Sequence, residues 1–541
     1  MQKTKRDKKQ LVMLLITSFL FVMAAAATML STYYMGQIVD RAVEGDLQGV
    51  LDMLLTAVGI MVLWFCIQML SIYSHIRYVS NGTLSLSHGL MRNLLARSLP
   101  GFRKNNVSYY LNLLGTDMDI YRLDRLNSMP YLAREGSETL FAALMLLYIN
   151  PWMCLAGVAM TVIPLIYSNC VTKITQKRKE AFSAASEEYT NTLKETMEGY
   201  ESIRVENASS RFLSRFDHMA GKRQKAYSAS KLVNTVSSRA AYAIGTILQL
   251  GSVALGGYLI VEGTLSPGML IISITYIAAV SDGINNFIES LINIRSTKPV
   301  VNKLISEAEA PVPEEIKAAP AAPEGTAVAA PLIEYENVTF GFGERELFHG
   351  FSHTFKPGGC YAIVGESGGG KSTLLKLLLK YYDGYEGVIR LAGQDIRNLT
   401  ENEIYAMVSV VSQTAFLFNT SLYENVTLYG GEPKEDSPEY QALLRDVNLT
   451  ALAQRVGGAP LGDFGDNIFG GERQRICIAR AMRRRPSVMI FDEPTTSLDP
   501  ENVSIINEFI FRHKDITRIV ISHDWSQEFL GRFDGVIRLG E

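Results

Sequence analysis

The segment GESGGGKST, residues 365–373, has the residue types and spacing that bind nucleotide phosphates. It follows the apolar run CYAIV and opens the run STLLKLLLKYY, so it joins a predicted strand to a predicted helix. Its glycines let backbone N–H groups converge, and the helix N-terminus adds about half a positive charge. Lys371 can reach the β- and γ-phosphates, and the Ser372 hydroxyl can ligate Mg²⁺. The residues expected to bind the nucleotide here are Gly365, Glu366, Ser367, Gly368, Gly369, Gly370, Lys371, Ser372 and Thr373.

A second segment, SVMIFDEPTTSLD at residues 487–499, supplies carboxylates for the same chemistry. An apolar strand ends at Asp492, which is expected to hold Mg²⁺ through water. Glu493 follows it and is expected to orient and deprotonate the water that attacks the γ-phosphate. A lone Asp-Glu pair could be a surface feature, but the phosphate loop in the same domain favours the catalytic interpretation.

These motifs lie in the second half of the chain, where short β-type runs alternate with helical ones. The runs LIEYENVTF, GCYAIVG, SVMIFD and RIVIS predict a buried, mostly parallel sheet within an α/β domain at residues 333–541. Residues 307–332, rich in Ala, Pro and Glu, predict an extended linker before it. The chain ends at VIRLGE, so the domain is expected to be trimmed at that edge.

The first half, residues 1–306, is predicted to be an all-α transmembrane domain. Residues 10–39, 53–74, 139–172, 240–261 and 263–281 contain no charged side chain, and about 20 apolar residues suffice for one span. The first run is too long for the core of a signal peptide. The 139–172 run breaks at Asn150-Pro151, so the third helix must begin near Tyr131 and carry Glu138 into the membrane. The six spans expected are about 11–38, 50–75, 128–149, 152–172, 238–261 and 267–290.

Charge and composition set the orientation and exclude other classes. Lys and Arg gather before the first span and between the second and third, which places both termini and both long loops in the cytosol. The lysine-bearing start fits a protein of a bacterial inner membrane. A formal net charge of −3 gives no basic bias towards nucleic acid. Five scattered cysteines and seven scattered histidines predict neither a disulfide framework nor a zinc site.

The order of these motifs resembles an ATP-binding-cassette (ABC) ATPase. With six spans before it, the whole chain resembles a half-transporter of the ABC exporter type, which implies ATP and Mg²⁺ as ligands. The resemblance implies that Phe342 stacks on adenine, that Gln413 senses Mg²⁺ and water, and that His523 touches the γ-phosphate. It also implies that Ser497 and Asp499 cross to a second subunit, and that coupling helices lie near residues 116–121 and 201–208.

The stretch NIFGGERQR, residues 467–475, departs from the family pattern. The family signature is Leu-Ser-Gly-Gly-Gln, and it begins a helix. The N-terminus of that helix binds the γ-phosphate of the ATP held by the partner subunit, and the serine donates a hydrogen bond to it. Here Ile468, Phe469, Gly470, Gly471 and Glu472 stand in that order. Gly470 and Gly471 can still contact the nucleotide, but Phe469 has no hydroxyl, and Glu472 adds a negative charge near the phosphate unless its side chain turns away. Loss of one such donor costs on the order of 10²–10³ in rate.

The chain keeps the residues expected to hydrolyse ATP, but its signature at residues 468–472 departs from the family pattern. This combination predicts a pair of two different subunits. In a heterodimer, Lys371 and Glu493 of this chain would face an intact signature from the other subunit. The signature of this chain would face the phosphate loop of the other subunit, which is expected to lack the catalytic base. A homodimer that tolerates the change is the alternative. Two further functions stay open, an importer on the exporter fold and a nucleotide-gated regulatory or channel-like protein. The transported substrate is unknown. Glu138 is either a substrate contact or, as favoured, an ion pair with Arg134. Asp282 and Glu289 either line a cavity that accepts cations or, as favoured, lie near the cytosolic rim.

Overall fold

The computed structural model describes residues 2–310, 332–343, 345–366, 368–430, 433–462, 465, 467–496, 498–523 and 526–539. The chain divides into two compact units, which are described separately. The membrane unit consists of Met1–Asn93 and Val107–Ala310, and the ATP-binding unit of Leu94–Asn106 and Pro311–Glu541. Of the predicted linker, residues 307–309 form the end of helix α11 (Lys298–Glu309), and residues 311–331 lie outside the described part of the chain.

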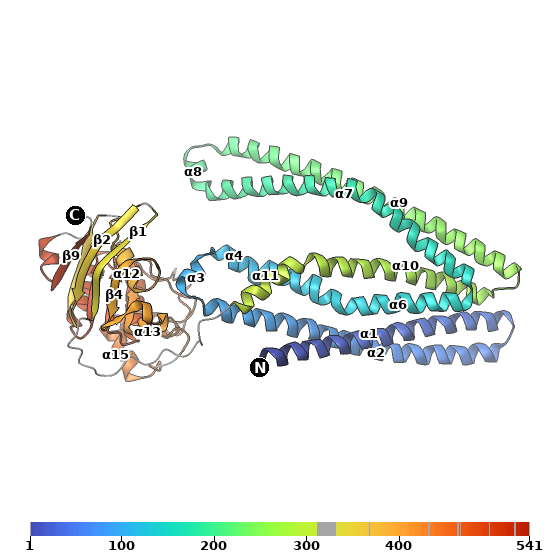
Figure 1. Ribbon diagram of the computed structural model, residues 1–541, viewed down its shortest axis with the longest axis horizontal. Helices are drawn as coiled ribbons and strands as arrows, with labels where there is room; N and C mark the ends of the chain where they lie inside the picture. Colours follow the sequence, from blue (N-terminus) through green and yellow to red (C-terminus); the bar gives the residue numbers. More distant parts are fainter. Residues whose placement is uncertain are drawn as a thin grey trace. The chain divides into compact units, whose positions relative to one another are not determined.

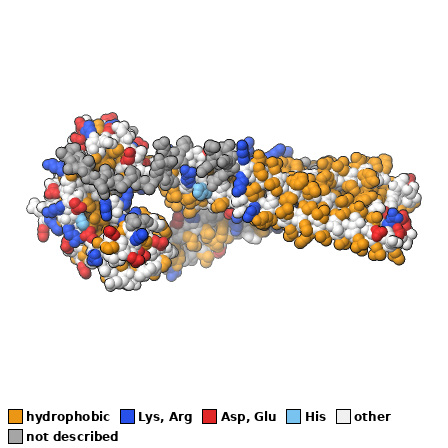
Figure 2. Space-filling model, turned by 90° about the horizontal axis from the view of Figure 1, so that it is seen from below, with side chains coloured by type: hydrophobic (Ala, Val, Ile, Leu, Met, Phe, Trp, Pro, Cys, Tyr) orange, Lys and Arg blue, Asp and Glu red, His pale blue; other side chains and the backbone are white. Residues whose placement is uncertain are grey.

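Long helices build the membrane unit (Figure 1). Among the described residues, α1, α2, α9 and α10 each contain a window apolar enough to cross a membrane, and Pro151–Pro164 is a shorter apolar stretch. Figure 2 shows the resulting hydrophobic side chains over most of this unit. The six helices that carry the predicted spans are α1 (Gln2–Val43), α2 (Leu47–Leu95), α6 (Asn127–Ile149), α7 (Pro151–Glu198), α9 (Ser209–Val261) and α10 (Pro267–Ser296).

Helices α1 and α10 approach closely where two glycines face each other. Asp40 accepts hydrogen bonds from the Ser266 hydroxyl at 2.6 Å and from the Gly268 N–H at 2.7 Å, so it caps the start of α10. A Cβ at Gly268 would lie 2.1 Å from the carbonyl oxygen of Gly36. The two helix backbones therefore touch at this point, in the way that small residues permit in membranes.

We expect Gly268→Ala to destabilise the membrane unit, because the added methyl collides with backbone that cannot turn aside. The expected cost is about 1–3 kcal/mol, as for other overpacked sites. Thermal unfolding of the detergent-solubilised chain measures it as a lowered midpoint. Gly257→Ala on α9 is the matched control, since its Cβ would meet no atom within 4 Å. Equal midpoints for the two variants would contradict the close packing.

The ATP-binding unit contains two sheets. The larger is entirely parallel, as predicted, with the order β6-β7-β8-β3-β9. The smaller is antiparallel, with the order β2-β1-β4-β5, and it holds the run LIEYENVTF, which the sequence alone did not separate from the parallel sheet. The strands are β1 (Ile333–Phe342), β2 (Arg345–Phe355), β3 (Cys360–Gly365), β4 (Glu386–Leu391), β5 (Gln394–Asp395), β6 (Val408–Val411), β7 (Val488–Asp492), β8 (Thr517–Ile521) and β9 (Gly535–Leu539).

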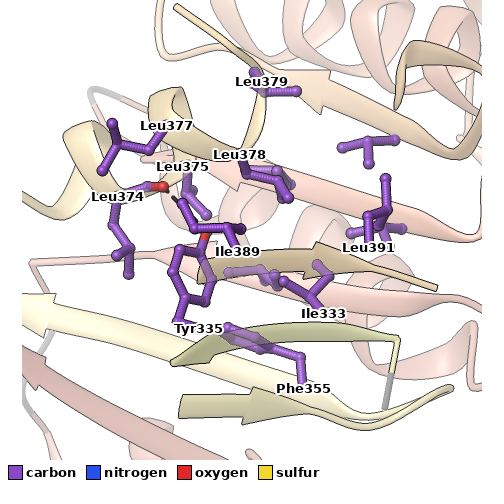
Figure 3. Close-up of a cluster of buried hydrophobic side chains, with 14 of the residues drawn as sticks. Ile333, Tyr335, Phe355, Leu374, Leu375, Leu377, Leu378, Leu379, Ile389 and Leu391 are labelled. Carbon is purple, nitrogen blue, oxygen red and sulfur yellow. Dashed lines mark hydrogen bonds between the residues drawn. The ribbon is translucent and has the colours of Figure 1, made fainter. Parts of the chain in front are cut away.

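A buried apolar cluster holds the helix that follows the phosphate loop. Helix α12 (Lys371–Leu378) packs its leucines between the two sheets, and the Tyr335 hydroxyl donates to the Leu374 carbonyl at 3.1 Å (Figure 3). Full burial raises the pKa of Tyr335 far above its usual range, so this hydroxyl stays a donor. The closely packed apolar cluster thus holds helix α12 in place.

The short helix α3 (Leu99–Arg103) lies between membrane helices in sequence but belongs to the ATP-binding unit. Ser98 caps it, and the Arg103 guanidinium lies over the Tyr381 ring at 4.8 Å. Residues 116–121, expected to form the first coupling helix, belong instead to the membrane unit. The sequence did not single out α3, because it is too short to show a helical period. Near the second expected position, α8 spans Tyr200–Val205.

Candidate nucleotide-binding site

Four of the predicted site residues lie at one edge of the parallel sheet, where the strands end at their carboxyl termini. Strands β6, β7, β8 and β3 are consecutive neighbours in that sheet. Gln413 follows β6, Asp492 ends β7, His523 follows β8 and Gly365 ends β3. Because parallel strands present their carboxyl ends at the same edge, segments far apart in sequence converge there.

The phosphate loop has the backbone conformation that only glycine adopts readily. Gly368 and Gly370 have φ of +83° and +86°, and Gly370 begins α12. A Cβ at Gly365 would lie 2.2 Å from the Leu539 carbonyl oxygen. The Lys371 side chain is buried, and its Nζ donates to the carbonyl oxygens of Gly365 at 2.6 Å and Glu366 at 2.8 Å. Ser367 lies outside the described residues.

Ser372 and Asp492 meet across 120 residues of sequence. The Ser372 hydroxyl donates to Oδ1 of Asp492 at 3.2 Å. Burial raises the pKa of the Asp492 carboxyl, and the Ser372 hydrogen bond partly opposes that rise. Hydroxyl and carboxylate oxygens suit Mg²⁺. Among the described residues no group of three His, Cys, Asp or Glu side chains gathers, so phosphate and water oxygens would complete the shell of a bound ion.

Glu493 is held by three side chains. The Gln413 amide donates to Oε2 at 2.7 Å, and His523 Nε2 lies 2.7 Å from Oε1. The Thr496 hydroxyl also donates to Oε2, at 3.2 Å. Glu493 itself has φ +50°, a strained value for a residue with a side chain, and such strain concentrates at functional sites. The predicted base Glu493 therefore forms one hydrogen-bonded group with Gln413 and His523.

The aromatic Phe342 ends strand β1 and is about half exposed. Its ring is 5.2 Å from the Phe340 ring and 5.1 Å from the Tyr382 ring, centroid to centroid, both edge-on. The exposed part of this side chain could contact a purine. Sequence reasoning missed both Tyr382 and Thr496. The available signals were the aromatic run KYYDGY after the P-loop helix and the threonines that follow Glu493.

The departure from the family signature lies at the start of α17 (Gly470–Met482), a 13-residue helix. Phe469 occupies the N-cap position with a ring that is 71% exposed, and it offers no side-chain acceptor there. Oε2 of Glu472 accepts the Phe469 N–H at 3.2 Å and an Arg455 guanidinium N–H at 2.7 Å. Arg455 also lies over the Phe469 ring at 5.7 Å. The Glu472 side chain thus turns back, the alternative that the sequence left open, and its pairing with Arg455 was not predicted.

Two further predicted residues lie beside this helix. Gly471 touches α18 (Pro500–Arg512), because a Cβ there would lie 2.2 Å from Cγ of Asn502. Asp499 caps α18 through the Asn502 N–H, and its pKa is lowered mainly by the Asn502 side chain. Ser497, the other residue expected to cross to a second subunit, lies outside the described residues.

The fold and the site together define a P-loop ATP-binding domain joined in one chain to a bundle of membrane-spanning helices. Residues 348–496 match the family described as ABC transporter, and residues 14–283 match the ABC transporter transmembrane region. The chain therefore belongs to the ABC transporter family and has the architecture of a half-transporter. It is a multi-pass inner-membrane protein whose ATP-binding domain is cytoplasmic.

Similar proteins include importers and flippases. The mycobactin import ATP-binding/permease protein IrtB of Mycolicibacterium smegmatis is 32% identical over 284 residues, 51% of this chain and 48% of that protein. The alignment thus spans about half the length of IrtB. An ATP-dependent lipid A-core flippase of Syntrophus aciditrophicus is 27% identical over 459 residues, 81% of this chain and 73% of that protein. A bacterial Atm1-family ABC exporter with ATP bound shares the fold, with a TM-score of 0.73 at 22% identity, over 99% of this chain and 94% of that one.

Proposed function

We propose that this chain is one half of an ATP-driven exporter. The observation that carries the proposal is the group around Glu493, in which Gln413 and His523 contact its two carboxylate oxygens. Such a group fits the activation of a water molecule for attack on the γ-phosphate. Asp492 and Ser372 are placed to hold Mg²⁺, which would neutralise charge on the phosphates. Lys371 and the N-terminus of α12 provide the complementary positive charge.

We further propose that the partner is a different ABC subunit. The start of α17 presents an exposed Phe469 where the family has a hydroxyl donor, so this signature is poorly suited to a transition state on the partner's nucleotide. The Glu493 group supports efficient hydrolysis on this chain's own nucleotide. A second subunit with an intact signature would use that group, and its own nucleotide would face Phe469. ATP would then be hydrolysed at one site and retained at the other.

The test is to purify the chain alone and together with a candidate partner, an ABC half-transporter whose signature keeps the serine. We expect ATP hydrolysis to rise at least tenfold in the co-purified pair. The hydrolysis should depend on Glu493 of this chain and on the signature serine of the partner. Brisk hydrolysis by the chain alone, abolished by Glu493→Gln, would overturn the heterodimer.

Import is a second candidate, favoured by the similarity to a mycobactin importer. The direction is measured in inside-out vesicles, where an exporter accumulates its substrate and an importer releases it. In the membrane unit, Nε of Arg134 lies 3.9 Å from Oε2 of Glu138, so the favoured ion pair is present. Asp282 and Glu289 are exposed on α10.

A further inference from the structure

A polar cavity lies between helices α7 and α9 of the membrane unit. Its volume is about 450 Å³. Six positions along α7 and four along α9 line it, and most of these side chains carry a hydroxyl, an amide or an ammonium group. The lining residues are Tyr167, Val171, Thr172, Thr175, Gln176, Lys179, Asn234, Ser237, Ser238 and Ala241.

The cavity crosses the predicted boundary between membrane and cytosol. The fourth span is expected to end near residue 172 and the fifth to begin near residue 238, and both positions lie within the cavity lining. Tyr167 and Lys179 are twelve residues apart on one helix, or about 18 Å along its axis. The lining changes along that axis from Tyr167 and Val171 through hydroxyl groups to Gln176 and Lys179. A phospholipid has the same order, from acyl chain through glycerol esters to phosphate.

The charge around the cavity favours an anion. Residues 151–179 and 218–261, which supply every lining residue, contain no Asp or Glu. Six cations lie within a few residues of the lining: Lys173, Lys177, Arg178, Lys179, Lys231 and Arg239.

Lys179 is the cation that lines the cavity itself. Glu180 follows it, but Oε1 of Glu180 accepts the Gln176 amide at 3.0 Å. Within the described part of the chain, no carboxylate pairs with Lys179, so its ammonium can take an external anion.

We propose that this cavity binds the head group of an anionic phospholipid from the inner leaflet. Basic pockets between transmembrane helices on the cytosolic side bind anionic lipid head groups, and each lysine near an anionic surface contributes to that attraction. Lys179 contacts the phosphate, Ser237, Ser238 and Thr175 bind the glycerol and ester oxygens, and Tyr167 and Val171 contact the first acyl carbons. All of these residues belong to the membrane unit of this chain, so the site is distinct from the ATP site.

The test uses the full-length chain in a neutral detergent without nucleotide, titrated with phosphatidylglycerol or phosphatidylcholine and followed by native mass spectrometry. We expect Lys179→Gln to weaken phosphatidylglycerol binding about fivefold. Ser237→Leu, which fills the cavity with apolar volume, should weaken it at least as much. Lys225→Gln is the matched control, because it removes the same charge from an exposed position on α9 outside the lining. Phosphatidylcholine binding should not change.

Three results would overturn the proposal. Equal losses in Lys179→Gln and Lys225→Gln would show diffuse attraction to the helix surface. Unchanged binding in Ser237→Leu would place the lipid elsewhere. Displacement of the lipid by millimolar inorganic phosphate would identify a site for free phosphate. Because no nucleotide is present, none of these results depends on ATP hydrolysis or on the heterodimer.

Discussion

Replacing Glu493 by Gln is expected to lower ATP hydrolysis by the assembled transporter at least 100-fold. General-base catalysis contributes about 10²–10⁴ in rate, and an amide cannot take the proton. The Gln side chain has nearly the same shape, so Gln413, His523 and Thr496 can still contact it. ATP should therefore bind as well as before. Phosphate release measures the rate, and fluorescence of a labelled ATP analogue measures binding.

The control for this prediction is Glu508→Gln, on the exposed surface of α18. It removes the same charge from the same domain and should leave turnover within twofold. If Glu493→Gln retained more than a tenth of the turnover, the group around Glu493 would not contain the base. Weaker binding of the ATP analogue in that variant would instead point to a structural role.

Repairing the signature should activate the chain in the absence of any partner. We expect Phe469→Ser with Glu472→Gln to raise ATP hydrolysis by the isolated chain by about 10²–10³, the usual value of one preorganised donor. Serine supplies both the N-cap acceptor for α17 and the hydroxyl for a phosphate, and glutamine keeps the bond to the N-cap N–H without a charge. Steady-state phosphate release at saturating ATP measures the change.

Two companion variants make this result specific. Phe469→Ala with Glu472→Gln removes the ring and the charge without adding a hydroxyl, so it separates steric relief from hydrogen bonding. Adding Glu493→Gln to the repaired chain should abolish the gain. If the repaired chain stayed inactive although light scattering showed it to be dimeric, then Phe469 and Glu472 would not be what limits the isolated chain.

Contiguous motifs could be predicted from the sequence, and contacts between distant segments mostly could not. The residues of the phosphate loop and Asp492 stand next to the strands that position them, so spacing alone placed them. The convergence of Gln413 and His523 on Glu493 depends on the order of the strands. The sequence indicated these two residues only through the resemblance to a family. The pair of Arg455 and Glu472 joins two helices, and no local pattern marks it.

The limits of prediction were similar in the fold. Charge-free runs identified the membrane helices because their length is set by the bilayer. The antiparallel sheet was not separated from the parallel one, because a strand such as β1 has the same composition in both. Helix α3 was missed because five residues carry too little periodicity.

The position of Lys371 bears on how the loop selects its ligand. Its ammonium is bonded to two carbonyl oxygens of its own loop. An arriving phosphate must therefore displace the two carbonyl oxygens that already bind the ammonium. A phosphate group with two negative charges does so more readily than chloride or a single carboxylate. We therefore expect the loop to favour the multiply charged phosphates of a nucleotide over singly charged anions.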